Sequence, residues 1–254
     1  MAHPKLGQHF LIKGAILERI AAAACPAHEE IVVEIGPGRG ALTEKLLKRA
    51  DRVVAVELDP DLAAHLRHRF AAEPRLEVLQ ADALATDLNQ WGRAPIAGNL
   101  PYYAASPILE KAVRSPAARA VFLIQKEVAD RLVAPPGRRE YGFLTVQIAL
   151  FAKVRKLFEV KPAAFHPPPK VDSAVVLLEP CERPADLADP ARFLEFVGHC
   201  FRHKRKTLRN NLAEVYGKQV LETWPEAGQR AEQISLDGFL DMYWRIECGP
   251  MRAG

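Results

Sequence analysis

Short apolar, β-branched runs alternate with stretches of helical spacing over the first two thirds of the chain. The runs predict five buried strands, at residues 31–35, 53–57, 76–80, 95–99 and 121–125. Between them, residues 41–50 place three leucines on one helix face, and Pro60 fits the first turn of a second helix over 61–70. Strands that alternate with helices imply right-handed crossovers, so we expect an α/β fold with a mostly parallel sheet.

The pattern changes in the last third of the α/β region. A helical stretch at 142–153 is followed by two strand-like runs, at 154–160 and 171–179. The proline-rich connection between these runs is typical of a long loop that joins paired strands rather than of a crossover helix. We therefore expect the sheet to end in an antiparallel hairpin.

A change of composition at Pro180 marks the expected domain boundary. Pro and Asp residues predict a linker at about residues 180–190, after which the spacing is helical only, with a last helix at 236–246. The predicted domains are residues 1–183, which contain the sheet, and residues 184–254, which form a small α-helical domain.

The composition of the 254 residues is that of an ordinary globular protein, with 49% hydrophobic and 26% charged residues. Thirty-five basic and thirty-one acidic residues leave a net charge of +4, so clustering of the basic residues matters more than their number. Four scattered cysteines without a C-x-x-C predict neither a disulfide framework nor a zinc site. With no long apolar segment and no signal-peptide pattern, we expect a soluble cytoplasmic protein without a metal.

Three glycines follow the first predicted strand, in Glu34-Ile-Gly-Pro-Gly-Arg-Gly40. Glycine lets the backbone turn tightly and approach a ligand that a Cβ would exclude. A plain strand-to-helix turn is the alternative, but it needs one glycine rather than three. The spacing of Gly36, Gly38 and Gly40 also differs from the G-x-G-x-x-G of dinucleotide-binding proteins, which disfavours a nicotinamide-dependent oxidoreductase.

Acidic residues lie at the ends of the next two predicted strands, the second of which ends in Ala81-Asp82. Glu57 lies 21 positions after Gly36, where a carboxylate can accept hydrogen bonds from both ribose hydroxyls. Asp82 can accept one from the amino group of an adenine. Each acid alone also fits a solvated loop or a helix N-cap. Because the carboxyl ends of parallel strands converge on one crevice, the two acids together favour a nucleoside site.

The fourth predicted strand runs directly into Asn99-Leu100-Pro101-Tyr102. The exocyclic amine of adenine is a poor nucleophile because its lone pair is delocalised into the ring. The Asn99 oxygen and the Leu100 carbonyl, projected by Pro101, can accept the two N–H protons and direct that lone pair outward. Tyr102 offers a face on which the base can stack, worth about 1–3 kcal/mol. The alternative is an Asn-Pro turn with a half-buried tyrosine.

These motifs closely resemble those of the bacterial small-subunit ribosomal RNA adenine dimethyltransferases, S-adenosylmethionine enzymes with a Rossmann-like class I methyltransferase sheet. The resemblance covers nearly the whole chain and is carried by residues 7–11, 34–38, 56–59, 82–83, 98–102, 125–132, 165–173 and 202–208. It implies dimethylation of N6 of two adjacent adenines in the 3′-terminal hairpin loop of small-subunit ribosomal RNA. It also implies action late in subunit biogenesis, on an immature 30S particle, by a monomeric enzyme.

The resemblance further implies roles for single residues. His9 and Leu11 would cover the methionine end of the cofactor, and Phe165 would be a second aromatic that clamps the flipped adenine. Many relatives have Asn where this chain has His9, so that contact would run through an imidazole. The implied cofactor set is His9, Leu11, Gly36, Gly38, Glu57, Leu58, Asp82, Ala83 and Asn99.

Five basic residues lie between Glu195 and Glu214 without an acid among them. They are Arg202, Lys204, Arg205, Lys206 and Arg209. A solvated helix face is the alternative, but phosphate contacts are favoured, because hairpin RNA offers both phosphates and splayed bases. The second domain is therefore predicted to bind RNA.

Two other functions stay open from the sequence. The related macrolide-resistance enzymes methylate adenine in large-subunit ribosomal RNA, and the helical C-terminal region does not by itself separate them from small-subunit enzymes. A ribosome-assembly factor, with methylation secondary, would bind pre-ribosomal particles even when Asn99 is replaced. The match of motifs along the whole chain favours the small-subunit enzyme.

Overall fold

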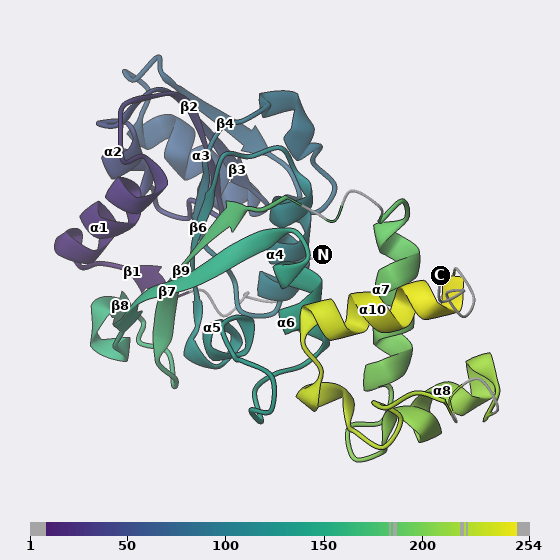
Figure 1. Cartoon of the computed structure of the whole chain (residues 1–254). Coiled ribbons are helices and arrows are strands. Elements are labelled where there is room, and N and C mark those ends of the chain that lie inside the picture. The colour runs from purple at the N-terminus through teal and green to yellow at the C-terminus, as the bar shows by residue number, and fades with distance from the viewer. Residues whose placement is uncertain (1–8, 183, 185–186, 219–220, 222, 248–254) are drawn as a thin grey trace. The chain divides into compact units, whose positions relative to one another are not determined.

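The computed structural model describes residues 9–182, 184, 187–218, 221 and 223–247, and the chain forms two units (Figure 1). Unit 1 comprises residues 1–129 and 152–180, and unit 2 comprises residues 130–151 and 181–254. We expected the segment 130–151 in the first domain, but it groups with the C-terminal helices, because its helix packs against one of them. The chain passes from unit 1 to unit 2 for the second time between residues 180 and 181, close to the expected domain boundary.

Unit 1 is built on a seven-stranded sheet with the order β4-β3-β2-β5-β6-β9-β7. The first five of these strands are parallel, and β9 runs antiparallel to both β6 and β7. This confirms the mostly parallel sheet with a terminal antiparallel hairpin. The strands are β2 (Glu29–Ile35), β3 (Ala50–Glu57), β4 (Leu76–Gln80), β5 (Ile96–Asn99), β6 (Ala120–Gln125), β7 (Ala152–Val160) and β9 (Ser173–Pro180).

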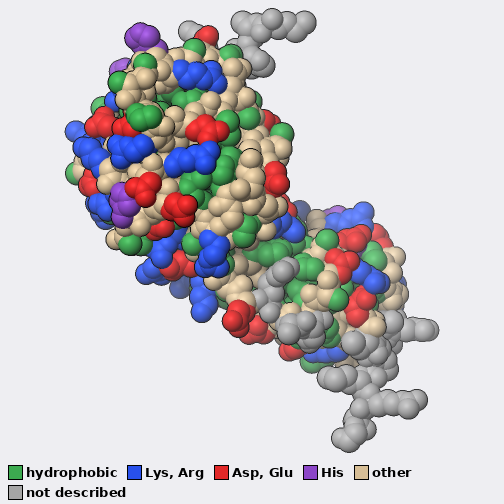
Figure 2. Space-filling model, turned by 90° about the horizontal axis from the view of Figure 1, so that it is seen from above, with side chains coloured by type: hydrophobic (Ala, Val, Ile, Leu, Met, Phe, Trp, Pro, Cys, Tyr) green, Lys and Arg blue, Asp and Glu red, His purple; other side chains and the backbone are tan. Residues whose placement is uncertain are grey.

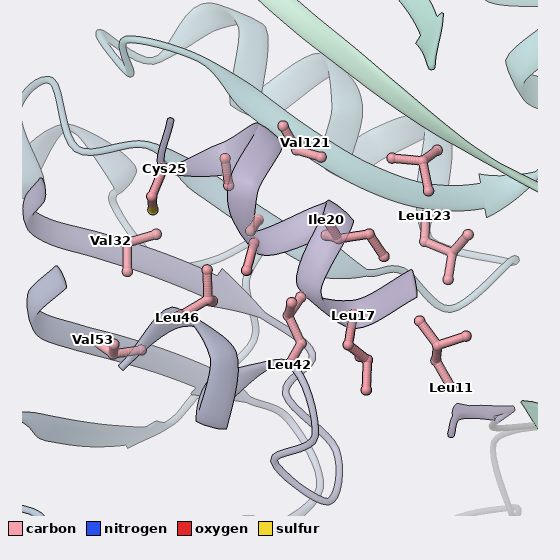
Figure 3. Close-up of a cluster of buried hydrophobic side chains, with 14 of the residues drawn as sticks. Leu11, Leu17, Ile20, Cys25, Val32, Leu42, Leu46, Val53, Val121 and Leu123 are labelled. Atoms are coloured by element: carbon pink, nitrogen blue, oxygen red, sulfur yellow. The ribbon is translucent and has the colours of Figure 1, made fainter. Parts of the chain in front are cut away.

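Side chains of the central strands are buried on both faces of the sheet. Val32 and Val53 belong to a cluster that packs beneath α1 (Gly14–Ala24), as Figure 3 shows. The next residue on each strand, Val33 and Val54, points to the opposite face and is equally buried. Burial on both faces explains why these strands are continuous apolar runs rather than alternating ones.

Helices cover the sheet of unit 1 at the crossovers. The helix α3 begins with Pro60 directly after Asp59, whose carboxylate accepts hydrogen bonds from two backbone N–H groups of the first turn. The helix predicted over 41–50 is much shorter, because only four residues are α-helical before β3 begins at Ala50. The remaining elements are α2 (Thr43–Leu46), α3 (Pro60–Arg69), η1 (Leu88–Trp91), α4 (Ala105–Arg114) and α5 (Lys126–Leu132), of which α5 continues into unit 2 from Asp130.

A second, two-stranded sheet joins the N-terminal segment to the loop before β9. Its strands β1 (Phe10–Leu11) and β8 (Phe165–His166) pair antiparallel, and Ile12 N donates to Ala164 O over 2.9 Å. A short 3-10 helix, η2 (Pro162–Ala164), precedes β8. Strands of two residues have no detectable period, so the sequence analysis missed this pairing.

Unit 2 is helical in the part that the structure describes. The ring of Phe193 on α7 (Pro190–Phe201) meets that of Tyr243 edge-on, with 5.5 Å between centroids. The predicted linker lies partly outside the described residues. No described helix is long and apolar enough to cross a membrane. The other elements are α6 (Phe143–Ala149), α8 (Leu208–Tyr216), η3 (Ala231–Gln233) and α10 (Leu236–Glu247).

Candidate active site

A cavity of about 200 Å³ opens in unit 1 where β2, β3, β4 and β5 end. This is the crevice at which open α/β sheets bind ligands. It brings together every residue of unit 1 that was predicted for the cofactor or for catalysis. They are His9, Leu11, Gly36, Gly38, Glu57, Leu58, Asp82, Ala83, Asn99, Leu100, Pro101 and Tyr102.

The glycine-rich turn after β2 lines the cavity. Gly36 and Gly38 have φ angles of +69° and +58°, in the left-handed region that L side chains avoid. A Cβ on Gly38 would also lie 3.0 Å from the ring of Phe10. The turn therefore requires glycine both for its backbone conformation and for the approach of the N-terminal segment.

Each carboxylate oxygen of Glu57, at the end of β3, accepts a hydrogen bond from a backbone N–H group. Its Oε2 accepts from Gly38 N over 2.9 Å, and its Oε1 accepts from Asp59 N over 3.0 Å. The residue is only 5% exposed, and this burial raises the pKa of its carboxyl group, while the two backbone donors lower it. Since each carboxylate oxygen has a further lone pair, Glu57 can still accept hydrogen bonds from a ligand in the cavity.

Asp82 lies beyond the end of β4 and differs from Glu57 in its surroundings. Its side chain is exposed, and its Oδ1 accepts from Leu84 N over 2.8 Å. Asp82 thus stabilises a turn, which fits the alternative of a solvated loop residue. It also lines the cavity. The second carboxylate oxygen is left to accept a hydrogen bond.

A second glutamate, Glu34, lines the cavity from within β2. It is 1% exposed and accepts a hydrogen bond of 2.6 Å from the Thr43 hydroxyl. Burial, and to a smaller extent the charge of Glu57, raise the pKa of Glu34 to about 8, against the effect of the hydroxyl. The cavity therefore contains one carboxyl group that favours its neutral form near pH 7.

Asn99 is oriented by the N-terminal segment. Its Nδ2 donates to the backbone carbonyl of His9 over 2.9 Å. The ring of His9 is fixed in turn, since its Nδ1 lies 2.8 Å from the Pro167 carbonyl, which can only accept. Because the amide nitrogen of Asn99 is engaged, its Oδ1 is left as the acceptor for a group in the cavity.

Tyr102 lies beside His9 at the mouth of the cavity. The two ring centroids are 5.8 Å apart, and the Tyr102 hydroxyl is 3.0 Å from Ser173 Oγ. Burial raises the pKa of Tyr102, which stays a phenol. Leu100 is buried and its N–H donates to Leu123 O on β6, while the Pro101 carbonyl accepts from Ala104 N. That the Leu100 carbonyl projects into the site stays a prediction.

Phe165 is the one predicted residue of unit 1 that lies apart from the cavity. It is 4% exposed, belongs to the hydrophobic core cluster, and does not line the cavity. The reason is the pairing of β1 with β8, which sets Phe165 opposite Leu11. Its contact with a target adenine stays a prediction, and it would require the side chain to leave the core.

The five basic residues that were predicted to contact RNA are all exposed. Arg202 pairs with Glu214 at 3.2 Å, and Lys204 Nζ donates to the Arg139 carbonyl over 3.2 Å. Within the described residues, the side chains of the other three, Arg205, Lys206 and Arg209, form no ion pair. Figure 2 shows Lys and Arg mixed with Asp and Glu over the visible face, so basic side chains do not dominate that view.

Several residues that line the cavity were not predicted from the sequence to be site residues. The guanidinium of Arg39 lies over the ring of Phe10, 4.7 Å from its centroid, and Tyr103 directly follows the Asn-Leu-Pro-Tyr string. Both had a signal in the sequence, because Arg39 lies inside the glycine-rich string and Tyr103 directly follows Tyr102. Among the described residues there is no group of His, Cys, Asp and Glu that could hold a metal ion.

The parallel sheet, the glycine turn and the strand-end carboxylates define a class I methyltransferase, and solved structures of methyltransferases agree. The structure has a TM-score of 0.79 and 29% identity to a dimethyladenosine transferase from Plasmodium falciparum, covering 93% of this chain and 98% of that one. It has a TM-score of 0.74 and 28% identity to the 23S rRNA methyltransferase ErmE, covering 94% and 99%.

Sequence comparison identifies the family. The chain is 45% identical to a ribosomal RNA small subunit methyltransferase A from Acidobacterium capsulatum, over 96% of this chain and 91% of that protein. It is 43% identical to the protein of the same name from Bordetella bronchiseptica, over 95% and 92%. The model of the ribosomal RNA adenine dimethylase family matches residues 1–247, and the chain belongs to that family.

Proposed function

We propose that this protein uses S-adenosylmethionine to dimethylate N6 of two adjacent adenines in the 3′-terminal hairpin loop of small-subunit ribosomal RNA. Membership of the adenine dimethylase family supports the reaction, and the names of the similar curated proteins support the small subunit. The observation that carries the proposal is the orientation of Asn99, whose amide nitrogen is engaged by His9 and whose oxygen is left to accept.

The cavity residues fit S-adenosylmethionine. Glu57 is rigidly held by two backbone donors and would accept from the ribose hydroxyls, while Asp82 would accept from the adenine amino group. Leu58 and Ala83 supply apolar contacts beside these acids, and the glycine turn leaves room beneath the methionine end. When bound, the cofactor supplies a methyl group activated for in-line displacement.

The residues at the mouth of the cavity would orient the target adenine. Asn99 Oδ1 and the Leu100 carbonyl would accept the two amine protons, so that the nitrogen lone pair is no longer delocalised into the ring. Tyr102 would stack on the base, with its hydroxyl held by Ser173. The amine proton becomes acidic once the nitrogen is alkylated, so the reaction needs no strong general base.

The RNA partner would be bound by both charge and stacking. The exposed residues Arg202, Lys204, Arg205, Lys206 and Arg209 would contact phosphates. The substrate in this proposal is the RNA within an immature 30S particle in the cytoplasm, late in subunit biogenesis, and the enzyme acts as a monomer.

Methylation assays on defined particles test the proposal. The protein is incubated with labelled S-adenosylmethionine and either small or large ribosomal subunits that lack the modification, and the methylated adenines are mapped by mass spectrometry. We expect N6,N6-dimethyladenine at two adjacent positions near the 3′ end of small-subunit RNA. Modification of large-subunit RNA would favour the alternative, a large-subunit enzyme such as the 23S rRNA methyltransferase ErmE. Particle binding without methylation would favour an assembly factor.

A further inference from the structure

Tyr103 is the most exposed of the large apolar side chains in the described part of the chain, at 62%. It also lines the cavity. An aromatic ring left in water next to a ligand cavity loses contact with water when a ligand packs against it, which favours binding. Nothing in the roles given above to the Asn99–Tyr102 string accounts for this ring.

Two further exposed apolar side chains lie on the same cavity. Leu58 is 49% exposed and directly follows Glu57, and Leu84 is 41% exposed and comes two residues after Asp82. Each of these leucines thus accompanies one of the two carboxylates at the strand ends. Together with Tyr103 they make an apolar rim at the end of the cavity that holds Glu57 and Asp82.

Tyr103 lines the same cavity as Glu57 and Asp82, and their carboxylates act electrostatically on its phenol. Partial burial raises the pKa of Tyr103, and the negative charges of Asp82 and Glu57 raise it further. Tyr102 is different, because its hydroxyl contacts Ser173 and its ring lies beside His9. The two consecutive tyrosines therefore serve different parts of the cavity, Tyr102 the side of Asn99 and His9, and Tyr103 the side of the two acids.

We propose that Tyr103 is a cofactor-binding residue that closes the cavity over the adenosine part of S-adenosylmethionine, with Leu58 and Leu84 on the same rim. The identity of the ligand rests on the proposed function. The ring of Tyr103 packs on the adenosine, while Glu57 and Asp82 accept its polar hydrogens. Methionine and RNA contacts belong to other residues, so this role is separable from both.

Calorimetry with two ligands tests the assignment. S-adenosylhomocysteine contains the whole adenosine and amino-acid parts, whereas 5′-methylthioadenosine lacks the amino acid. Wild type, Tyr103→Phe and Tyr103→Ala are titrated with each ligand, and Val133→Ala, which changes an exposed apolar side chain outside the cavity, is the matched control. Circular dichroism and the urea midpoint of each variant verify that it is folded.

We expect Tyr103→Ala to weaken both ligands by the same factor, about tenfold, as loss of one base–aromatic contact predicts. Tyr103→Phe should keep the wild-type affinities within about twofold, because the aromatic face is retained. Val133→Ala should do the same, because Val133 does not line the cavity. Unchanged affinity of Tyr103→Ala for both ligands would overturn the assignment. A loss limited to S-adenosylhomocysteine would also overturn it, in favour of a contact with the amino-acid part.

An RNA-binding measurement tests the remaining possibility, which is that Tyr103 contacts the RNA and not the cofactor. Tyr103→Ala should bind small-subunit particles as wild type does, and a defect confined to particle binding would assign Tyr103 to the RNA instead. Failure of the wild-type protein itself to bind S-adenosylhomocysteine would contradict the proposed function rather than the position of Tyr103 on the rim. The two proposals can therefore fail separately.

Discussion

The cavity of unit 1 and the basic segment 202–209 of unit 2 are held in different ways. In the cavity, polar side chains are fixed by hydrogen bonds, as for Glu57 with two backbone donors and Asn99 with the His9 carbonyl. In the basic segment the five predicted basic side chains are exposed, and among them only Arg202, with Glu214, and Lys204, with the Arg139 carbonyl, contact a partner in the described part of the chain, each at 3.2 Å. Preorganised groups suit transition-state stabilisation, whereas mobile charges suit phosphate contacts of variable geometry.

This difference predicts how substitutions in each region act. A change in the cavity removes one oriented hydrogen bond and should affect a single step, the chemistry or the binding of the cofactor. A change in the basic segment removes one of several similar charges and should change RNA binding in proportion to the number lost, with a dependence on salt. Substitutions in each region test whether the division is correct.

The largest effect is expected at Asn99. Because its oxygen is the oriented acceptor, Asn99→Ala should slow methyl transfer at saturating cofactor by about a hundredfold or more, with little loss of RNA affinity. Single-turnover kinetics measure the rate, and calorimetry establishes the cofactor concentration that saturates the variant. Asn89→Ala, an exposed residue outside the cavity, is the control. Near-normal transfer in Asn99→Ala would mean that another group orients the adenine.

Cofactor binding should depend on Glu57 more than on Asp82. Hydrogen bonds to a charged acceptor contribute about 1.5–3 kcal/mol, so Glu57→Ala should weaken binding of S-adenosylhomocysteine about tenfold or more. Asp82→Ala should weaken this binding less, because Asp82 is exposed to solvent. Calorimetry measures both affinities, with Glu30→Ala at the opposite end of β2 as the control. Wild-type affinity in a folded Glu57→Ala protein would remove Glu57 from the cofactor site.

Much of the cavity could be predicted from the sequence because strand ends converge. Once β2, β3, β4 and β5 are recognised as neighbouring parallel strands, Gly36, Glu57, Asp82 and Asn99 must lie at one edge of the sheet. The motifs at 36–40 and 99–102 directly follow strands, so the position of a strand end also gives the position of the motif. This is why the predicted residues that follow these strands line the cavity, whereas His9 and Leu11 were expected there only from the resemblance to the family.

Contacts between segments far apart in the chain could not be predicted in the same way. The β1–β8 pairing sets Leu11 opposite Phe165 and so buries that ring, yet two-residue strands have no periodicity. The hydrogen bond from Asn99 to His9 joins residues 90 positions apart. Tyr103 follows the Asn-Leu-Pro-Tyr string and so could have been included, but its exposure beside Glu57 and Asp82 requires coordinates.

The pH dependence of stability should reveal the buried carboxyl group of Glu34. Its pKa is raised from 4.5 to about 8, so between these values the native state binds a proton that the unfolded state has released. The free energy of unfolding should therefore decrease as the pH rises through this range, by up to about 1.4 kcal/mol per pH unit. In Glu34→Gln this contribution is absent.

Urea unfolding of both proteins at several pH values between about 4.5 and 8 measures this contribution. The stability of wild type relative to Glu34→Gln should be greatest at the acidic end and should decrease towards pH 8. The exposed Glu30→Gln serves as the control and should follow wild type. Parallel curves for wild type and Glu34→Gln would show that Glu34 titrates like a solvated carboxyl group.

The smallest effect is expected in the basic segment, where charges act additively. Each phosphate contact contributes about 0.7 to the dependence of log affinity on log salt for single strands, so Arg205→Glu with Lys206→Glu should reduce that slope by about 1.4. Cofactor affinity should not change, since neither residue lines the cavity. The exposed pair Lys48→Glu with Arg93→Glu alters the net charge equally and should leave the slope as in wild type. Equal slopes for both pairs would support a solvated face at 202–209, and RNA binding would then have to be assigned to another surface.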